Sequence, residues 1–508
     1  MAFGITKRLV FYCIIATLGS VIFGWEIGML NIIFSMRSTY GKRFGLFYQD
    51  DKGAWVPTHS KSTREGIITP MFTIGCVFGT IFAMSLMDKI GRVKPLAIGS
   101  VIYTIGSIIQ TFSDTIVVFC IGRLIAGVAC GMTMVISPVY IAEITPKNRR
   151  GAMGLLFNFN LQVGLLFASF ADTLCLKLIE GEAQWRTAVA CQLIPAVLFM
   201  ILIWFAPETP RYLLMKDRDE GALENLADVR EKPMDDSEVV QEYYDMRGKL
   251  KAEIATGTVP WSKLFINKFY LYRIILCCIL QFLHMLVGVN AINYYSSQIY
   301  EDYLHIDTAM WGSWLVVINN LFVVIFTIPA LNYVEKVGRR KILVIGAVVL
   351  AICMFFIFLL CLLLDVTKKN IFGILCVVCT YIYSVAYGWS WGSTVYVWQS
   401  EIFPLRIRSK ANAIAMMFQY AGSALVTGLT STLMIHFKYY AFLIFTTLAI
   451  IAFIFSFLCI KETKGRFLED LENLYGFDRK YNDKLQDQKV SDAVSRAFDI
   501  NENNVIKA

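Results

Sequence analysis

Long apolar runs, separated by polar segments, occupy most of this chain. Hydrophobic residues make up 56% of its 508 residues and charged residues only 17%, against about 25% charged residues in soluble domains. Crossing a hydrocarbon core of about 30 Å takes about 20 apolar residues. The sequence therefore predicts a polytopic membrane protein, with spans near 9–30, 66–86, 95–112, 115–137, 151–172, 185–206, 270–291, 310–331, 341–364, 371–398, 409–431 and 439–460.

The two sets of six spans carry near-copies of one charged segment. MDKIGRVK, with Asp88 and Arg92, recurs as VEKVGRRK, with Glu335 and Arg339. A charged loop repeated inside a membrane protein indicates a duplicated helical bundle. We therefore expect an all-α membrane protein with an N-terminal six-helix bundle (1–206, with an outward loop at 31–65), a linker with short helices near 218–230 and 237–254 (207–268), a C-terminal six-helix bundle (269–460) and a polar tail (461–508).

A second repeat places an acid at the end of a span and an arginine in the following loop. Glu143 and Arg150 have the same spacing as Glu401 and Arg408, and PETPR at 207–211 is echoed by KETKGR at 461–466. Such pairs suit charge-assisted clusters that hold neighbouring helix ends together. We expect gating clusters at the inner ends of both bundles, formed by Glu143, Arg150, Glu335, Arg339, Glu401 and Arg408. Simple anchoring of these charges in lipid headgroups is the alternative.

Basic residues gather in the short loops on one side of the predicted spans. By the positive-inside rule this side is the cytoplasm, which assigns both termini and the linker to it. The opposite short loops carry acids such as Asp114 and Glu301. The net charge of +8 thus reflects topology and contact with the bilayer, and it gives no reason to expect a nucleic-acid partner. No cleavable signal peptide is evident, so the first helix is expected to direct insertion.

The sequence gives little support for catalysis or for a bound cofactor. Most of the 13 cysteines lie within predicted spans, without spacing suited to a metal or a disulfide framework. Neither a phosphate-binding loop nor a nucleophile elbow is present. We therefore expect no enzyme activity, no cofactor and no metal site.

Five motifs in a fixed order carry a family resemblance. GRLIAG at 122–127, PVYIAEITP, PETPR, VEKVGRRK and GVNAINYY at 288–295 together resemble the sugar porters of the major facilitator superfamily. The resemblance covers nearly the whole chain, and the long first outward loop and SEIFPLRIRSK look most like fungal hexose transporters. It implies two six-helix bundles around one central site that opens to each side alternately.

The resemblance also implies a place for proton coupling. Glu26, in FGWEIG, falls where proton-coupled relatives have an acid in the first helix, and Arg123 matches its partner in the fourth helix. An acid inside a span is costly unless it has a partner or a function. Coupling of sugar entry to protons is one expectation, and facilitated diffusion with the same acid is the other.

Sugar recognition in the family rests on amides and aromatic rings, and this chain matches that pattern in part. Asn290 falls on the family asparagine of the seventh helix, and Tyr294 and Tyr295 match the aromatic pair of the outer gate. The two glutamines that usually precede this motif are replaced by His284 and Met285. This departure weakens the expectation of glucose in particular.

Neighbouring amides could compensate, because they lie about one helical turn from the replaced positions. Asn158 takes the place of the family glutamine in the fifth helix, with Gln162 four residues later, and Gln281 precedes His284 by three. We expect a substrate site formed by Asn158, Gln162, Gln281, His284, Asn290, Tyr396, Gln419 and Tyr420. The alternative for each is a polar contact between helices.

The sequence leaves two functional classes open. The first is a secondary transporter of a monosaccharide, most simply a hexose, with a polyol, a pentose or a sugar acid as alternative substrates. The second is a sugar sensor that does not transport, which the short tail at 461–508 argues against, since known yeast sensors of this type have a very long one. The family implies a plasma-membrane protein with a monomeric functional unit.

Overall fold

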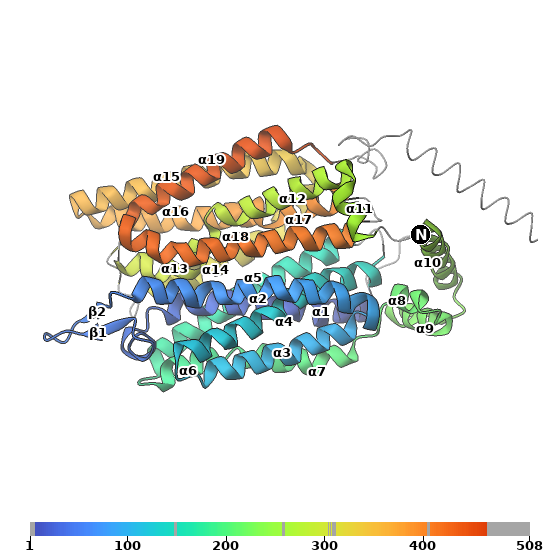
Figure 1. Cartoon of the computed structure of the whole chain (residues 1–508), viewed down its shortest axis with the longest axis horizontal. Helices are drawn as coiled ribbons and strands as arrows, with labels where there is room; N and C mark the ends of the chain where they lie inside the picture. Colours follow the sequence, from blue (N-terminus) through green and yellow to red (C-terminus); the bar gives the residue numbers. More distant parts are fainter. Residues whose placement is uncertain are drawn as a thin grey trace, which may run out of the picture.

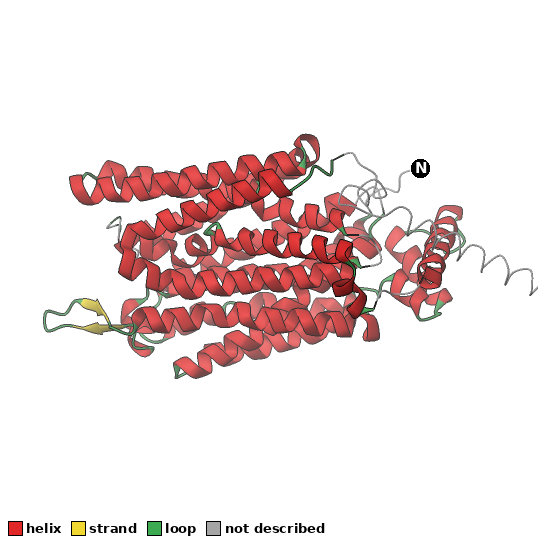
Figure 2. Cartoon of the chain, turned by 45° about the horizontal axis from the view of Figure 1, so that its top comes forward, coloured by secondary structure: helices red, strands yellow, loops and turns green. Residues whose placement is uncertain are grey.

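The structure, a computed structural model, describes residues 6–146, 150–256, 260–302, 304, 306, 311–403 and 407–464, without the side chains of some helical residues, among them Arg150 and Glu335. Within these residues the chain is almost entirely helical, and long helices run side by side along one axis (Figures 1 and 2). Most of the expected tail lies outside the described residues.

The first half of the chain forms one group of helices, and a threonine marks the start of two of them. Thr6 accepts a hydrogen bond from Leu9 N, and Thr115 from Val118 N, so each satisfies a backbone N–H of a first helical turn. The long elements are α1 (Lys7–Ile33), α2 (Lys61–Ile90), α3 (Val93–Thr111), α4 (Ile116–Ile144), α5 (Arg150–Leu178), and a sixth rod made of α6 (Ala183–Ala190), α7 (Leu193–Leu202) and η3 (Ile203–Phe205).

The second half forms a matching group in which two rods are interrupted. Gly288 separates the first two helices, and Ser390 separates α16 from α17. The elements are α12 (Lys268–Leu286), α13 (Val289–Asp302), α14 (Ser313–Val337), α15 (Arg339–Thr367), α16 (Asn370–Trp389), α17 (Trp391–Ile402), α18 (Arg408–Phe437), η5 (Lys438–Tyr440) and α19 (Ala441–Cys459). Across the boundary between the halves, α2 packs against α18 and α5 against α14.

Ten helical segments of the described chain are long and apolar enough to cross a membrane. The last of them, Lys410–Cys459, covers most of α18 and all of α19, and a shorter apolar stretch, Ser313–Pro329, belongs to α14. When α18 and α19 are counted separately and α14 is added, the helices fit the twelve expected spans. Many large apolar side chains, such as Phe82, Ile201 and Ile374, are half-exposed on them, as a surface facing hydrocarbon requires.

The two ends of the helical body differ. One end carries η1 (Arg37–Gly41) and an antiparallel hairpin of β1 (Phe47–Gln49) and β2 (Trp55–Pro57), in which Tyr48 pairs with Val56; we call this end the hairpin face. The other end, which we call the basic face, carries the repeated basic loops and the linker helices α8 (Pro210–Met215), α9 (Asp219–Arg230), α10 (Ser237–Thr256) and α11 (Trp261–Ile266) (Figure 1).

The linker helices have a small core of their own and are held against the N-terminal bundle. Leu214, Leu226 and Val239 are buried together among α8, α9 and α10. Asp228 accepts a hydrogen bond from the Tyr12 hydroxyl at 2.6 Å, and Arg230 donates to the carbonyl of Ile144 at 2.9 Å. Both α9 and α10 coincide with the helical stretches expected near 218–230 and 237–254, whereas the strands within 31–65 were not anticipated.

Candidate functional site

A fully buried ion pair lies in the middle of the N-terminal bundle. Arg123 Nη1 of α4 lies 3.0 Å from Glu26 Oε1 of α1, and neither side chain is accessible to solvent. The Tyr103 hydroxyl lies 3.2 Å from the other carboxylate oxygen, and Arg123 also donates to the carbonyl of Ile68 at 3.1 Å. Such hydrogen bonds offset part of the desolvation cost of burying two charges.

Aromatic rings connect this ion pair to the second bundle. The Arg123 guanidinium lies over the Phe72 ring, 5.4 Å from its centre. Phe72 contacts Phe23, with 5.5 Å between ring centres, and Phe23 contacts Tyr420 of α18, with 6.2 Å between centres. The charged pair and the expected substrate residues of the second bundle are thus joined by packed side chains.

His284 is the centre of a polar cluster in the C-terminal bundle. Its Nδ1 lies 3.2 Å from Gln281 Oε1, and its Nε2 lies 2.5 Å from the Tyr387 hydroxyl. The imidazole stacks on Tyr387 and meets the ring of Tyr396 edge-on, with centres 5.5 and 5.6 Å apart. A neutral imidazole, which donates from Nδ1 to the amide oxygen and accepts at Nε2, satisfies both contacts.

Amides extend this cluster across three helices. Gln281 of α12 is hydrogen-bonded to Gln399 of α17, which lies 3.2 Å from Asn412 Oδ1 of α18. Gln419 donates to the Tyr396 hydroxyl at 2.7 Å. Gln399 and Asn412 were not predicted, although each is an amide at or inside an expected span, which is itself a signal of function.

The remaining predicted residues of the second bundle lie on α13 and α18. Asn290 donates to Ser423 Oγ at 2.7 Å. The hydroxyl of Tyr420 and the amide oxygen of Gln419 are buried without a hydrogen-bond partner in the part of the chain that the structure describes. Buried polar groups are normally paired, so these atoms offer hydrogen-bonding capacity to a polyhydroxylated ligand.

The fifth helix contributes a less connected set. Asn158 and Gln162 lie one turn apart on α5 and are half-buried, and within the described residues neither side chain has a hydrogen bond. Further along α5, Ser169 Oγ lies 3.1 Å from Asn320 Nδ2 of α14, across the boundary between the bundles. Asp172 was missed: its carboxylate is buried on α5 with no partner among the described residues, although an acid at the end of an expected span was visible in the sequence.

At the hairpin face, hydrogen bonds join the two bundles. Asn31 of α1 donates to the carbonyl of Asn293 at 2.8 Å and accepts from Ser297 N at 2.9 Å. The Tyr295 hydroxyl lies 3.2 Å from Thr69 Oγ1 of α2. Of the two tyrosines expected to gate the site, Tyr295 therefore takes part in this contact through its hydroxyl, whereas the Tyr294 hydroxyl faces Arg123 of the first bundle.

A buried carboxylate completes this contact, and we call the set Asn31, Glu65, Tyr295, Gln298 and Ser431 the hairpin-face latch. Glu65, on the first turns of α2, accepts from Ser431 Oγ of α18 at 2.5 Å and from Gln298 Nε2 of α13 at 3.1 Å. Lys61 Nζ lies 3.9 Å from Glu65 Oε1, the oxygen that accepts from Gln298. Next to it, a Cβ at Gly66 would lie only 2.7 Å from the carbonyl oxygen of Gly428, so only glycine permits this approach of α2 and α18.

The repeated charges of the basic face form two similar clusters. Arg92 pairs with Glu143 at 2.9 Å in the first bundle, and Arg339 with Glu401 at 2.8 Å in the second. Both pairs join helices of the same bundle. Three other residues were expected in these clusters. The Arg408 guanidinium donates to the carbonyl of Phe403 at 3.1 Å, and the side chains of Arg150 and Glu335 lie outside the described residues.

A carboxylate that accepts backbone N–H groups accompanies each of these pairs. Glu208 accepts from the N–H groups of Arg92 and Val93, and Glu462 from those of Arg339 and Arg340. These acids belong to the PETPR and KETKGR motifs. Burial raises the pKa of Glu208, and the backbone N–H groups act against that increase.

Comparisons with known proteins give the following matches. A family model described as "Sugar (and other) transporter" matches residues 12–475. The glucose transporter GlcP of Staphylococcus epidermidis is 30% identical over 480 residues, covering 92% of this chain and 96% of that protein. The hexose transporter HXT11 of Saccharomyces cerevisiae is 28% identical over 477 residues, covering 91% of this chain and 82% of that protein.

Two solved structures share the fold over nearly the whole chain. The proton:xylose symporter XylE bound to 6-bromo-6-deoxy-D-glucose is 25% identical, with a TM-score of 0.75, and covers 93% of this chain and 100% of that one. An inward-open conformation of the xylose transporter XylE from E. coli, 24% identical, has a TM-score of 0.73 and covers 92% and 99%.

Proposed function

Because the chain belongs to the sugar transporter family of the major facilitator superfamily, we propose that it carries a hexose across the membrane by alternating access. The observation that carries the proposal is the polar cluster of the second bundle. Its amides and tyrosines, with spare hydrogen-bonding atoms on Gln419 and Tyr420, can both donate to and accept from the hydroxyls of a neutral sugar.

His284 has no free hydrogen-bonding atom to offer a sugar in this conformation. Both of its ring nitrogens already have partners, in Gln281 and Tyr387. A sugar in this cluster would therefore rely on Asn290, Gln419 and the tyrosines for its hydrogen bonds. The names of GlcP and HXT11 support a hexose. A pentose is the second candidate, because the structural relative XylE is a xylose symporter.

Two features support an assignment of the direction of opening. The bundles are joined at the hairpin face by the latch, and the positive-inside rule assigns the basic face to the cytoplasm. This conformation then corresponds to a carrier closed toward the outside. We further propose a plasma-membrane location, both termini in the cytoplasm and a monomeric functional unit.

Proton coupling would act through Glu26 and Arg123. A proton taken up by Glu26 from outside would neutralise one member of the buried pair and change the charge that the first bundle carries through the membrane. Each elementary charge moved is worth about 2.3 kcal/mol per 100 mV. With one proton per sugar and a membrane potential of about 100 mV, this free energy supports a sugar concentration about 40-fold higher inside than outside. Facilitated diffusion is the competing mechanism.

The test is uptake of labelled glucose by a yeast lacking its own hexose transporters and expressing this chain, with pentoses, polyols and sugar acids as competitors. We expect saturable uptake that a protonophore abolishes. Saturable uptake that survives the protonophore would overturn coupling and leave transport. Surface-localised protein that takes up none of these compounds would overturn transport and favour a sensor.

Replacing Glu26 by Gln isolates the acid responsible. We expect Glu26→Gln to remove the dependence of uptake on external pH and on the protonophore, because the amide cannot exchange a proton. Asp172→Asn is the matched control, since Asp172 is also a buried acid but has no arginine partner in the described chain; it should leave that dependence unchanged. If Asp172→Asn removes the dependence and Glu26→Gln does not, the coupling residue has been misassigned.

A further inference from the structure

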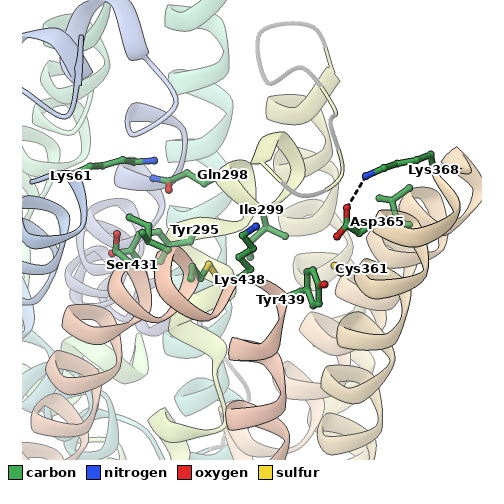
Figure 3. Close-up of a pocket in the computed structure, with 13 residues that line it drawn as sticks. Lys61, Tyr295, Gln298, Ile299, Cys361, Asp365, Lys368, Ser431, Lys438 and Tyr439 are labelled. Carbon is green, nitrogen blue, oxygen red and sulfur yellow. Dashed lines mark hydrogen bonds and ion pairs between the residues drawn. The ribbon is translucent and has the colours of Figure 1, made fainter. Parts of the chain in front are cut away.

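A cavity of about 440 Å³ lies at the hairpin face, beside the closed contact between the bundles (Figure 3). Its walls come from the first turn of α2, from α13, and from the ends of α15 and α18 with the η5 turn. Its volume falls in the range of about 300–1,000 Å³ that small-molecule sites occupy. No residue of the central polar cluster lines this cavity, so the two are separate.

Three residues of the latch line one side of the cavity. Tyr295, Gln298 and Ser431 line the cavity, and the last two are the residues that donate to Glu65, at 3.1 and 2.5 Å. Figure 3 shows Gln298 and Ser431 on the side of the cavity toward the first bundle, and Lys368 with Asp365 on the opposite side. A molecule in the cavity could therefore reach the groups that hold the two bundles together.

The walls combine hydrogen-bonding groups with apolar surface. Asp365 and Lys368 form an ion pair of 2.7 Å on the far wall, with Tyr439 near them. Leu364 and Met434 supply apolar surface. A carboxylate accepts from neighbouring hydroxyls, and an amide both donates and accepts, while apolar surface suits the C–H faces of a sugar ring. The lining thus fits a small polyhydroxylated molecule.

The charges of the lining favour a neutral ligand over an anion. Lys61 is held near Glu65 and Lys368 is paired with Asp365, so two of the three lining lysines already face a carboxylate. Lys438, on the η5 turn, adds one further donor. A negatively charged ligand would meet Asp365 at the wall and Glu65 behind the lining residues of the latch.

We infer that this cavity is a second sugar site, which holds an incoming sugar while the latch is closed; the inference rests on the proposed function and orientation. A sugar hydroxyl that binds Gln298 or Ser431 competes with Glu65 for the same atoms. Losing a donor leaves the buried carboxylate under-paired, which is unfavourable. Sugar binding at this cavity thereby weakens the latch and favours opening toward the outside.

The experiment measures protection of a thiol at the rim of the cavity. Ile435→Cys, at an exposed apolar position of the lining, is expressed in the full chain in yeast lacking its own hexose transporters, and its reaction with a membrane-impermeant maleimide is followed with and without external glucose. We expect glucose at four times its dissociation constant to slow the reaction about fivefold, since the free fraction falls as 1/(1 + [L]/Kd). Lys52→Cys, exposed on the hairpin turn, is the matched control and should react equally in both conditions.

Two double variants separate this cavity from the central site. With Asn290→Ala added, which impairs the central cluster, protection of the thiol should persist. Loss of protection in this variant would show that sugar binding at the central site causes the protection, and would overturn the inference. With Asp365→Ala added, protection should require about tenfold more glucose, because the wall loses its carboxylate; unchanged protection would also overturn it. Glucuronate, an anionic sugar, should protect the thiol less well than glucose. If glucuronate protects it and glucose does not, the site prefers an anion, and the inference of a neutral ligand is wrong.

Uptake measured in the same cells distinguishes this inference from the proposed function. Uptake without protection would overturn the second site and leave the transporter intact. Protection without uptake would overturn transport and leave a sugar site at the hairpin face.

Discussion

Glu26 and Arg123 show how a single pair of residues can constrain a membrane bundle. Both side chains are fully buried, with 3.0 Å between Nη1 and Oε1. Removing one member of such a pair leaves an uncompensated charge, at a cost of about 3–5 kcal/mol, whereas replacing both by apolar residues is often neutral. The stability of the first bundle therefore depends on the two residues jointly.

A comparison of single and double variants tests this dependence. We expect Glu26→Leu to destabilise the purified protein by about 3–5 kcal/mol, and Glu26→Leu with Arg123→Met to restore most of that loss. The measurement is thermal unfolding in detergent, followed by the fluorescence of a thiol-reactive dye. Equal destabilisation by the single and the double variant would mean that the contact contributes little, and that the remaining bonds of Arg123 to α2 dominate.

At the scale of an element, the break between α12 and α13 depends on Gly288. Its φ is +98°, a conformation that other residues adopt at a cost of about 1–2 kcal/mol. A Cβ there would also lie 2.9 Å from Met354 Cε and 3.0 Å from Phe445 Cγ. The break turns α13 so that Asn290 meets Ser423 and Tyr295 reaches α2, so it positions both the central cluster and the latch.

Gly288→Ala should destabilise the protein by more than the backbone cost alone and should reduce uptake. Gly181→Ala is the matched control, because Gly181 also has a positive φ, of +72°, but a Cβ there would have nothing within 4 Å. We expect the control to lose about 1–2 kcal/mol and to retain uptake. Thermal unfolding and initial uptake rates would check both; equal effects of the two variants would remove the role assigned to packing at Gly288.

For the whole molecule, closure at the hairpin face depends on how near the two bundles can approach. Gly66 and Gly428 bring α2 and α18 together beside Glu65, whose bonds to Ser431 and Gln298 cross the boundary. The basic face has charge clusters within each bundle, Arg92 with Glu143 and Arg339 with Glu401. The charge clusters therefore leave the two bundles free to move as separate bodies, which in this conformation are joined by the latch at the hairpin face and by the contact of α5 with α14.

A larger residue at Gly66 should hold the hairpin face open. We expect Gly66→Val to reduce uptake at least about tenfold and to increase the reaction of an impermeant maleimide with a thiol introduced by Ser423→Cys, below the latch, because repacking a side chain into a close contact costs about 1–3 kcal/mol. Gly248→Val, on α10 with nothing within 4 Å of an added Cβ, is the control. Reduced labelling in Gly66→Val would contradict the assignment of this contact as the outer closure.

The sequence by itself determined the class of molecule. Twelve apolar runs and two repeated charged loops predicted two six-helix bundles, and the resemblance of five motifs predicted the sugar porter family; the family match and the structural relatives confirm both. Glu26 could be selected in advance because a charge inside a span is rare without a partner or a function, and Arg123 because it matches the arginine that partners this acid in the family. The roles proposed for the site residues remain predictions.

Only the tertiary structure decided which polar groups meet. The bonds of Glu65 to Ser431, of Gln281 to Gln399 and of His284 to Tyr387 join helices far apart in the chain. Glu65 was assigned to a loop, because hydropathy does not show that α2 begins at Lys61. The pairing of such groups depends on the rotation and axial offset of each helix against its neighbours. Those quantities are set by close packing throughout the bundle, which the apolar pattern of a single span does not encode.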